Sequence, residues 1–208
     1  MKKNLNPKGS SFRPDPTKSY IAFNKPYAVL SQFSQPEGST KSTLANFTFP
    51  KDVYPVGRLD YDSEGLLLLT DDPRLNQLIL SPNRGHERTY FVQVENIPAT
   101  ESINSLSEGV MVEGRMTAKA TARVLLSEPN IANRVVPIRA RKNIPTSWLS
   151  LTLTEGRNRQ VRKMTAAVGH PTLRLYRISI GRLSLFDLKL LPGQWKKLTT
   201  AEIDLLFK

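Results

Sequence analysis

The chain has 208 residues, enough for one large domain or two small ones with a sizeable apolar core. It has no cysteine and only two histidines, His86 and His170. This excludes disulfides, thiolate metal sites and a cysteine nucleophile, and argues against a histidine-based metal site or a Ser-His-Asp triad. The net charge of +12 and the pI near 10.1 favour a polyanionic partner, most commonly nucleic acid.

The apolar runs of the chain are short. None approaches the roughly 20 residues of a membrane span, and the basic N-terminus lacks the apolar core of a signal peptide. We therefore expect a cytoplasmic protein without membrane contact.

Positive charge is unevenly distributed along the chain. From Arg134 to Arg182 there are eleven Lys or Arg residues and one acid, Glu155. A one-sided basic field favours a phosphate backbone and predicts salt-sensitive binding. A basic but unspecific solvated surface is the alternative.

The expected elements follow from hydrophobic periodicity and from capping signals. In chain order they are a disordered basic tail over 1–18, strands over 19–26 and 28–33, a short helix over 43–47, a buried strand over 66–69, a helix from Pro73 with Asp72 as N-cap, a strand over 88–95, a helix over 100–108, a strand–turn–strand over 110–126, an exposed basic segment over 127–146, a strand over 147–155, a helix over 158–169, a strand pattern over 172–185 and a helix capped by Thr199.

This succession predicts a strand-rich α+β fold with helices inserted between hairpins, not a regular βαβ series. The chain contains neither a P-loop nor a GxGxxG motif. Nucleotide hydrolysis and dinucleotide redox chemistry therefore lack support in the sequence.

The stretch GRLDYDSEGLLLLT, residues 57–70, places acids directly before a buried strand. Asp60 follows an inward-pointing leucine, so its carboxylate is expected where the loop meets the core. Such a carboxylate is costly unless it is paired with a cation. Arg159, Arg162 and Lys163 form a basic stripe on the 158–169 helix that could supply one, which would keep Asp60 ionised as a nucleophile. From the residues alone, a turn cap or a structural ion pair explains Asp60 better.

Four longer motifs occur in the order YIAFNKPYAVLSQF, VGRLDYDSEGLLLLT, RTYFVQV and EGRNRQVRKMTAAVGHPTLRLYRISIGRLSL. Together they resemble the pseudouridine synthases, in the branch typified by the small-subunit synthase A that modifies bacterial ribosomal RNA. The resemblance runs from about Tyr20 to Trp195. Residues 141–175 are most similar to the large-subunit enzymes of type E.

The resemblance implies an enzyme that isomerises uridine to pseudouridine with no cofactor and no metal. The base is detached from C1′ of its ribose, turned and rejoined through C5, and the target nucleotide is first flipped out of its stack. In the family the GRLD aspartate, here Asp60, is catalytic, and Tyr90 stacks on the uracil. Arg162 pairs with the aspartate, and Arg58 fills the vacated space. A phosphate contact is the alternative for Arg58, and a core position is the alternative for Tyr90.

Further basic residues are expected to contact the RNA backbone, although a merely charged surface would look the same. They are Arg139, Arg141, Lys142, Arg157, Arg159 and Lys163. Asp62 and Glu64 are expected to be solvated loop acids.

The resemblance also implies the family fold, a mixed, mostly antiparallel sheet with flanking helices and a central active-site cleft. Residues 19–208 are expected to form one catalytic domain of two halves, with the break near 85–90 and 125–145. We expect a monomer without an RNA-binding domain of the S4 type. The substrate implied is a uridine of 23S ribosomal RNA. Alternatives are small-subunit ribosomal RNA or transfer RNA, and a non-catalytic role in RNA binding or ribosome assembly.

Overall fold

The computed structural model describes residues 12–81, 84–138 and 144–208. The strands are β1 (Tyr20–Lys25), β2 (Val29–Leu30), β3 (Ser42–Thr43), β4 (Tyr54–Pro55), β5 (Glu64–Thr70), β6 (Arg88–Glu95), β7 (Met111–Val112), β8 (Arg115–Met116), β9 (Thr121–Val124), β10 (Thr146–Leu153), β11 (Thr172–Ile180), β12 (Leu183–Ser184) and β13 (Trp195–Lys197). The helices are α1 (Pro73–Leu80), α2 (Thr100–Glu108), α3 (Gln160–Ala167), α4 (Leu185–Leu188) and α5 (Thr200–Asp204), with 3₁₀ turns η1 (Leu44–Asn46) and η3 (Leu205–Phe207).

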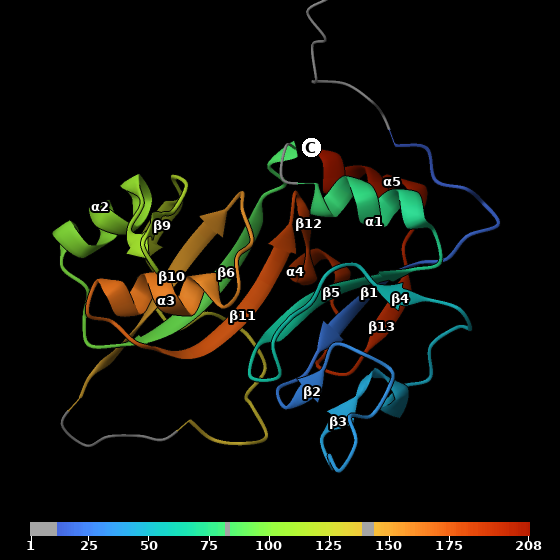
Figure 1. Ribbon diagram of the computed structural model, residues 1–208, viewed down its shortest axis with the longest axis horizontal. Helices are drawn as coiled ribbons and strands as arrows, with labels where there is room; N and C mark the ends of the chain where they lie inside the picture. The colour runs from blue at the N-terminus through green and yellow to red at the C-terminus, as the bar shows by residue number, and fades with distance from the viewer. Residues whose placement is uncertain (1–11, 82–83, 139–143) are drawn as a thin grey trace, which may run out of the picture.

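Nine of these strands form one sheet across the molecule (Figure 1). Its main path runs β13-β1-β5-β11-β6-β10-β9, while β4 pairs with β5 and β12 pairs with β11. Every neighbouring pair in this sheet is antiparallel except β5 with β11. The predicted α+β class, with a mixed and mostly antiparallel sheet, is confirmed.

The helices are divided between two halves of the sheet. Helices α2 and α3 pack with β6 and β10 around a cluster that includes Leu106, Val161 and Leu149. Helices α1, α4 and α5 pack on the other half, where Leu75, Ile203 and neighbouring side chains form a second cluster. In Figure 1, α2 and α3 lie at the left, α1 and α5 lie at the upper right, and α4 lies between them below β12.

Strand β5 is buried on both faces. Leu66 and Leu68 join the cluster under α1 and α5, whereas Leu67 and Leu69 join a third cluster with Ile21 and other side chains of β1 and its loop. All four leucines are at most 1% exposed. A strand in the middle of a sheet with both faces covered needs such a continuous apolar run, and it makes a rigid support for the loop before it.

The junction of β5 with β11 depends on a glycine. Gly65 lies opposite Arg177 in the parallel register, with φ at +103°. A Cβ at this position would lie 2.3 Å from the carbonyl oxygen of Arg177. Only glycine allows both this φ and this close approach of two backbones.

The structure corrects three expected elements. Residues 12–18 are not a disordered tail, since Phe12 is buried against Tyr20 and Phe207; residues 1–11 lie outside the described residues. The strand expected over 28–33 shrinks to β2, because the chain turns through Ala28 with φ at +60°. The strand–turn–strand over 110–126 is instead the hairpin β7–β8 followed by β9, which joins the main sheet.

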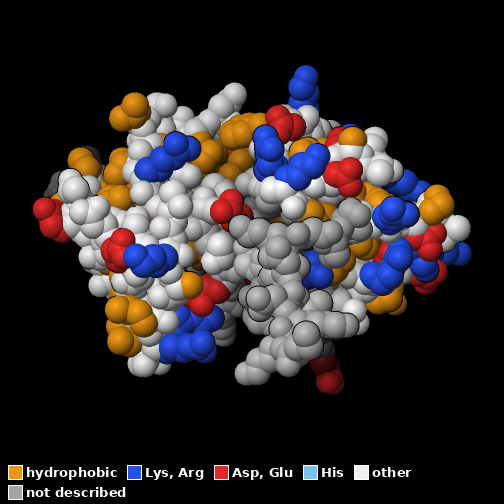
Figure 2. Space-filling model, turned by 90° about the horizontal axis from the view of Figure 1, so that it is seen from above, with side chains coloured by type: hydrophobic (Ala, Val, Ile, Leu, Met, Phe, Trp, Pro, Cys, Tyr) orange, Lys and Arg blue, Asp and Glu red, His pale blue; other side chains and the backbone are white. Residues whose placement is uncertain are grey.

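The surface seen in Figure 2 carries Lys and Arg side chains over both halves, mixed with acids. On this face the positive charge is therefore spread out, without one dominant patch. None of the helices in the described ranges has the length and apolarity that a membrane span requires.

Candidate active site

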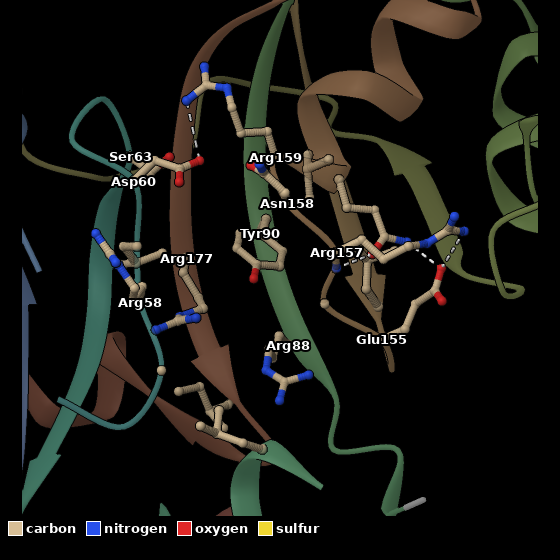
Figure 3. Close-up of a pocket in the computed structure, with 18 of the residues that line it drawn as sticks. Arg58, Asp60, Ser63, Arg88, Tyr90, Glu155, Arg157, Asn158, Arg159 and Arg177 are labelled. Carbon is tan, nitrogen blue, oxygen red and sulfur yellow. Dashed lines mark hydrogen bonds and ion pairs between the residues drawn. The ribbon is translucent and has the colours of Figure 1, made fainter. Parts of the chain in front are cut away.

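A cavity of about 950 Å³ opens between the two halves of the sheet (Figure 3). Its walls come from the loop before β5, the start of β6, the end of β10 with the loop that follows, and β11. The polar and charged residues that line it include Arg58, Asp60, Ser63, Arg88, Tyr90, Arg115, Glu155, Arg157, Asn158, Arg159, Gln160 and Arg177.

Asp60 lies in the loop that leads into β5. Its carbonyl oxygen accepts a hydrogen bond from the amide of Ser63 at 3.0 Å, which closes a turn. The carboxylate extends into the cavity and is 39% exposed. It is paired with Arg159, whose Nη1 lies 3.3 Å from Oδ2. Asp60 is thus more accessible than a fully buried ion pair would be, and one carboxylate edge stays open to the cavity.

The expected contact of Arg162 with Asp60 is wrong. Nη2 of Arg162 donates to the carbonyl oxygen of Asp62 at 2.8 Å and lies 3.3 Å from its carboxylate, while Nη1 donates to Thr172. Arg162 therefore holds the backbone of the loop that carries Asp60. The charge of Asp60 still raises the pKa of Arg162, against the stronger lowering effect of burial.

Arg159 bridges two acids at the start of α3. Besides Asp60, it contacts both carboxylate oxygens of Asp62, at 3.0 and 2.8 Å. Its backbone is left-handed, with φ at 52°, which aims the side chain back across the cavity mouth. Burial alone would raise the pKa of Asp62, but the Arg159 hydrogen bond and the nearby Arg162 hold it below its usual value. Asp62 is therefore a clamped loop acid and not the solvated one that was expected.

Tyr90 stands on β6 in the wall of the cavity. It lies opposite Arg177 of β11 and Leu151 of β10, and its half-buried ring packs against apolar side chains from two clusters. In Figure 3 the ring lies between Asp60 and Arg88 along the cavity. Tyr90 and Asp60 thus reach one cavity from opposite halves of the sheet, as a planar substrate between them would require.

The basic residues that were expected to contact RNA differ in whether they line the cavity and in whether they already have a partner. Arg58 is exposed, lines the cavity and makes no hydrogen bond or ion pair with the described residues. Arg157 is tied to the β7–β8 hairpin through the Met116 carbonyl at 2.8 Å, and it also contacts Glu155. Lys163 pairs with Glu113 of the same hairpin at 2.7 Å, outside the cavity lining. Arg139, Arg141 and Lys142 lie outside the described residues.

Three basic residues near the site were given no role from the sequence, namely Arg88, Arg174 and Arg177. Arg88 and Arg177 line the cavity, and Glu64 forms a buried ion pair with Arg174 at 2.8 Å. Glu64 was expected to be solvated, and that prediction is wrong. A signal was present in the sequence: Arg88 precedes Tyr90 by two positions, so both share one face of the strand. Arg174 and Arg177 interrupt an otherwise apolar strand pattern.

The described residues of the cavity do not form a cluster of acids suited to binding a metal ion. Across the described parts of the chain, no group of three or more His, Asp or Glu residues could hold a metal ion. The chemistry available in the cavity is that of a carboxylate, a phenol and several guanidinium groups.

Comparison with known proteins shows to which family the chain with this cavity belongs. The profile of the RNA pseudouridylate synthases matches residues 19–167, which include Asp60, Tyr90 and Arg162. The chain belongs to the RNA pseudouridylate synthase family, whose members convert uridine in RNA to pseudouridine.

Within the family the chain is similar to enzymes of one type. It is 50% identical over 176 residues to the ribosomal large subunit pseudouridine synthase E of Xanthomonas campestris pv. campestris, covering 85% of this chain and 93% of that protein. The enzyme of the same name from Vibrio parahaemolyticus is 48% identical over 178 residues, covering 86% and 73%. The crystal structure of a pseudouridylate synthase superposes with a TM-score of 0.74 at 28% identity, covering 91% of this chain and 74% of that one.

Proposed function

We propose that this chain converts one uridine of 23S ribosomal RNA to pseudouridine. The observation that carries the proposal is the meeting of Asp60 and Tyr90 in one cavity that several arginines line. The similar proteins named as large-subunit synthases of type E support the choice of RNA. An excess of guanidinium groups around the cavity suits a phosphate-bearing substrate.

The reaction needs no electron or energy source. The bond between N1 of uracil and C1′ breaks, a bond between C5 and C1′ forms, C5 loses its proton, and N1 gains one. In the proposal Asp60 acts on the ribose of the flipped nucleotide, and its open edge faces the space where C1′ would lie. Whether it attacks carbon or removes a sugar proton does not change its place in the site.

The other side chains of the cavity position the nucleotide. The ring of Tyr90 offers a flat apolar surface on which a uracil can stack. Arg58 is exposed and unpaired within the described residues, so its planar guanidinium is free to contact the RNA, either in the space that the flipped base leaves or at a phosphate. Arg159 pairs with the carboxylate of Asp60, and Arg162 holds the backbone of its loop through the carbonyl oxygen of Asp62.

We also propose that the protein acts as a monomer. Ribosomal RNA of bacteria is made in the cytoplasm, which is where we expect the protein to act.

The test is a carbodiimide primer-extension map of ribosomal RNA pseudouridines in cells that lack the protein. The cells are re-supplied with wild type, with Asp60→Asn, or with Asp52→Asn as a matched control. Asp52 is an exposed loop acid with φ at 63°, a conformation that asparagine tolerates well. We expect one 23S stop to be lost and to return with wild type and Asp52→Asn but not with Asp60→Asn.

A second readout measures turnover directly. Since C5 of the uracil becomes bonded to C1′, RNA carrying tritium at C5 releases the label at each turnover. An unchanged pseudouridine map would refute a ribosomal substrate and direct the tritium assay to transfer RNA. Restored growth or assembly with Asp60→Asn would show that RNA binding is the main role.

A further inference from the structure

The charged residues of the cavity differ in whether they have an opposite charge as partner. The two acids of its lining, Asp60 and Glu155, already face Arg159 and Arg157. The lining also contains Arg58, Arg88 and Arg177; in Figure 3 Arg88 lies on the far side of Tyr90 from Asp60, and Arg177 lies between Arg58 and Tyr90. We call these three residues the arginine cluster. Among the described residues, no carboxylate pairs with any of them in an ion pair.

Arg177 is the most buried member of the arginine cluster. The residue is 4% exposed, and its Nε donates to the carbonyl oxygen of Leu66 at 2.7 Å. Its Nη2 is buried and has no hydrogen-bond partner within the described residues. A guanidinium has five N–H donors, so part of this buried cation is left unsatisfied.

Arg88 has only neutral partners as well. Its Nη2 donates to the carbonyl oxygen of Ile79 at 2.8 Å and its Nη1 to that of His86 at 3.2 Å. Burial lowers the pKa of Arg88, and the charge of Arg177 acts in the same direction. Arg88 and Tyr90 share one face of β6, and Arg177 is the cross-strand partner of Tyr90. The three side chains therefore belong to one surface of the sheet.

A further buried cation lies close by. Lys25 is fully buried, and its Nζ donates to the carbonyl oxygens of Pro26 and Val29. Burial lowers the pKa of Lys25 to about 7; nearby acids oppose this effect, and the charge of Arg177 adds to it. The acid next to Gly65 is Glu64, but both of its oxygens are taken by Arg174.

Such an arrangement costs free energy in the empty protein. A buried cation without a counter-charge is destabilising, and neighbouring like charges add to the cost. An anion that enters the cavity removes both costs and gains charge-assisted hydrogen bonds. The arginine cluster is thus organised to bind an anion rather than to stabilise the empty fold.

We propose that the arginine cluster is a phosphate subsite that binds one of the two phosphates flanking the flipped uridine. The inference rests on the proposed function, which places the ribose of that nucleotide at Asp60. Tyr90 lies between Asp60 and Arg88 in Figure 3, so a base stacked on its ring belongs to a nucleotide whose phosphate reaches Arg88, with Arg177 beside it. The subsite holds the nucleotide in its flipped position while Asp60 acts on C1′.

The first experiment needs neither RNA nor turnover. Inorganic phosphate is titrated into the ¹⁵N-labelled protein, and the Arg Nε–Hε resonances are followed by NMR, with sodium chloride of equal ionic strength as reference. We expect phosphate-specific shifts at Arg88 and Arg177 that Arg88→Gln abolishes and Arg88→Lys retains in part. Lys197→Gln, which removes an exposed charge from the edge strand β13, is the matched control and should leave the shifts unchanged.

The second experiment uses RNA fragments with a neutral methylphosphonate either directly 5′ or directly 3′ of the target uridine. At one position we expect wild type to lose about tenfold to a hundredfold in kcat/KM, which corresponds to losing a hydrogen-bonded charge contact. Arg88→Gln should show no further loss at that position. Arg58→Gln changes an exposed side chain that has no partner among the described residues, so it tests the subsite even if Arg88→Gln is unstable. It should also reduce the methylphosphonate effect.

Two results would overturn the proposal. One is an absence of phosphate-specific shifts, or shifts that persist in Arg88→Gln. The other is full activity with both methylphosphonate substrates combined with a loss of activity when the target is 4-thiouridine. That result would mean that the arginine cluster binds the carbonyl groups of uracil. If wild type makes no pseudouridine in any ribosomal RNA, the proposed function fails, while the phosphate titration still decides the subsite.

Discussion

The buried ion pair between Glu64 and Arg174 links the strand behind the catalytic loop, β5, to β11. Their side chains are 4% and 5% exposed, and Arg174 donates to both carboxylate oxygens at 2.9 and 2.8 Å. The same guanidinium donates to the carbonyl oxygen of Ala132 at 2.8 Å. Glu64→Gln would leave a buried guanidinium without its counter-charge.

Removing one partner of such a pair costs about 3 kcal/mol or more, because the remaining charge stays desolvated. We expect Glu64→Gln to lower the free energy of unfolding by this amount in urea titrations followed by tryptophan fluorescence. The control is Glu108→Gln, which breaks the ion pair of Glu108 with Lys119. Those side chains are 70% and 77% exposed, and the expected loss is below about 1 kcal/mol.

A double variant separates the pair from its surroundings. Glu64→Gln combined with Arg174→Met removes both charges, so it should cost less than the sum of the two single losses. If Glu64→Gln cost no more than Glu108→Gln, or if the two single losses simply added, the reasoning from desolvation would be refuted.

Three further predictions concern stability. The hydrogen bond from Arg74 holds the pKa of Asp72 at about 2, below its usual 3.8. In urea titrations, wild type should therefore have a free energy of unfolding about 2 kcal/mol larger than that of Asp72→Asn. This difference should be constant above about pH 4 and should shrink as the pH falls toward 2. Lys25 has its pKa lowered from 10.5 to about 7 by burial, so the unfolded chain retains a proton that the folded one releases. Wild type should accordingly gain stability over Lys25→Met as the pH rises from about 7 to about 10, measured by urea midpoints. Gly65→Ala would place a Cβ 2.3 Å from a backbone carbonyl oxygen of β11, and should cost more than about 3 kcal/mol in thermal unfolding. Gly38→Ala, with φ at +67° and no atom within 4 Å of the added Cβ, should cost only about 1 kcal/mol.

Local patterns were sufficient for several of the regular elements. The strand over 88–95 and the helix over 100–108 have the bounds that periodicity predicts, and Asp72 caps α1 as expected. The capping box of Thr199 with Glu202 is also confirmed. These features depend on interactions within a few residues, which a sequence displays directly.

Pairings between distant segments were not predictable in the same way. Arg159 and Arg162 lie on adjacent turns of one helix region, and periodicity cannot say which of them meets Asp60 and which meets Asp62. The left-handed backbone of Arg159 turns its side chain toward Asp60, whereas Arg162 pairs with Asp62. Glu64 lies among loop acids, yet it is buried because β11 brings Arg174 next to it from 110 positions away.

The position of β11 between β5 and β6 bears on how the protein is synthesised. Strands β5 and β6 follow one another in the chain, but neither pairs with the other, since β11 lies between them. Asp60 and Tyr90 therefore come to face one cavity only after Thr172–Ile180 has been made and inserted. A chain truncated before Thr172 should show no native near-ultraviolet circular dichroism. A nascent chain would thus be unable to modify RNA until almost all of it has left the ribosome, and the long-range pairing predicts slow folding.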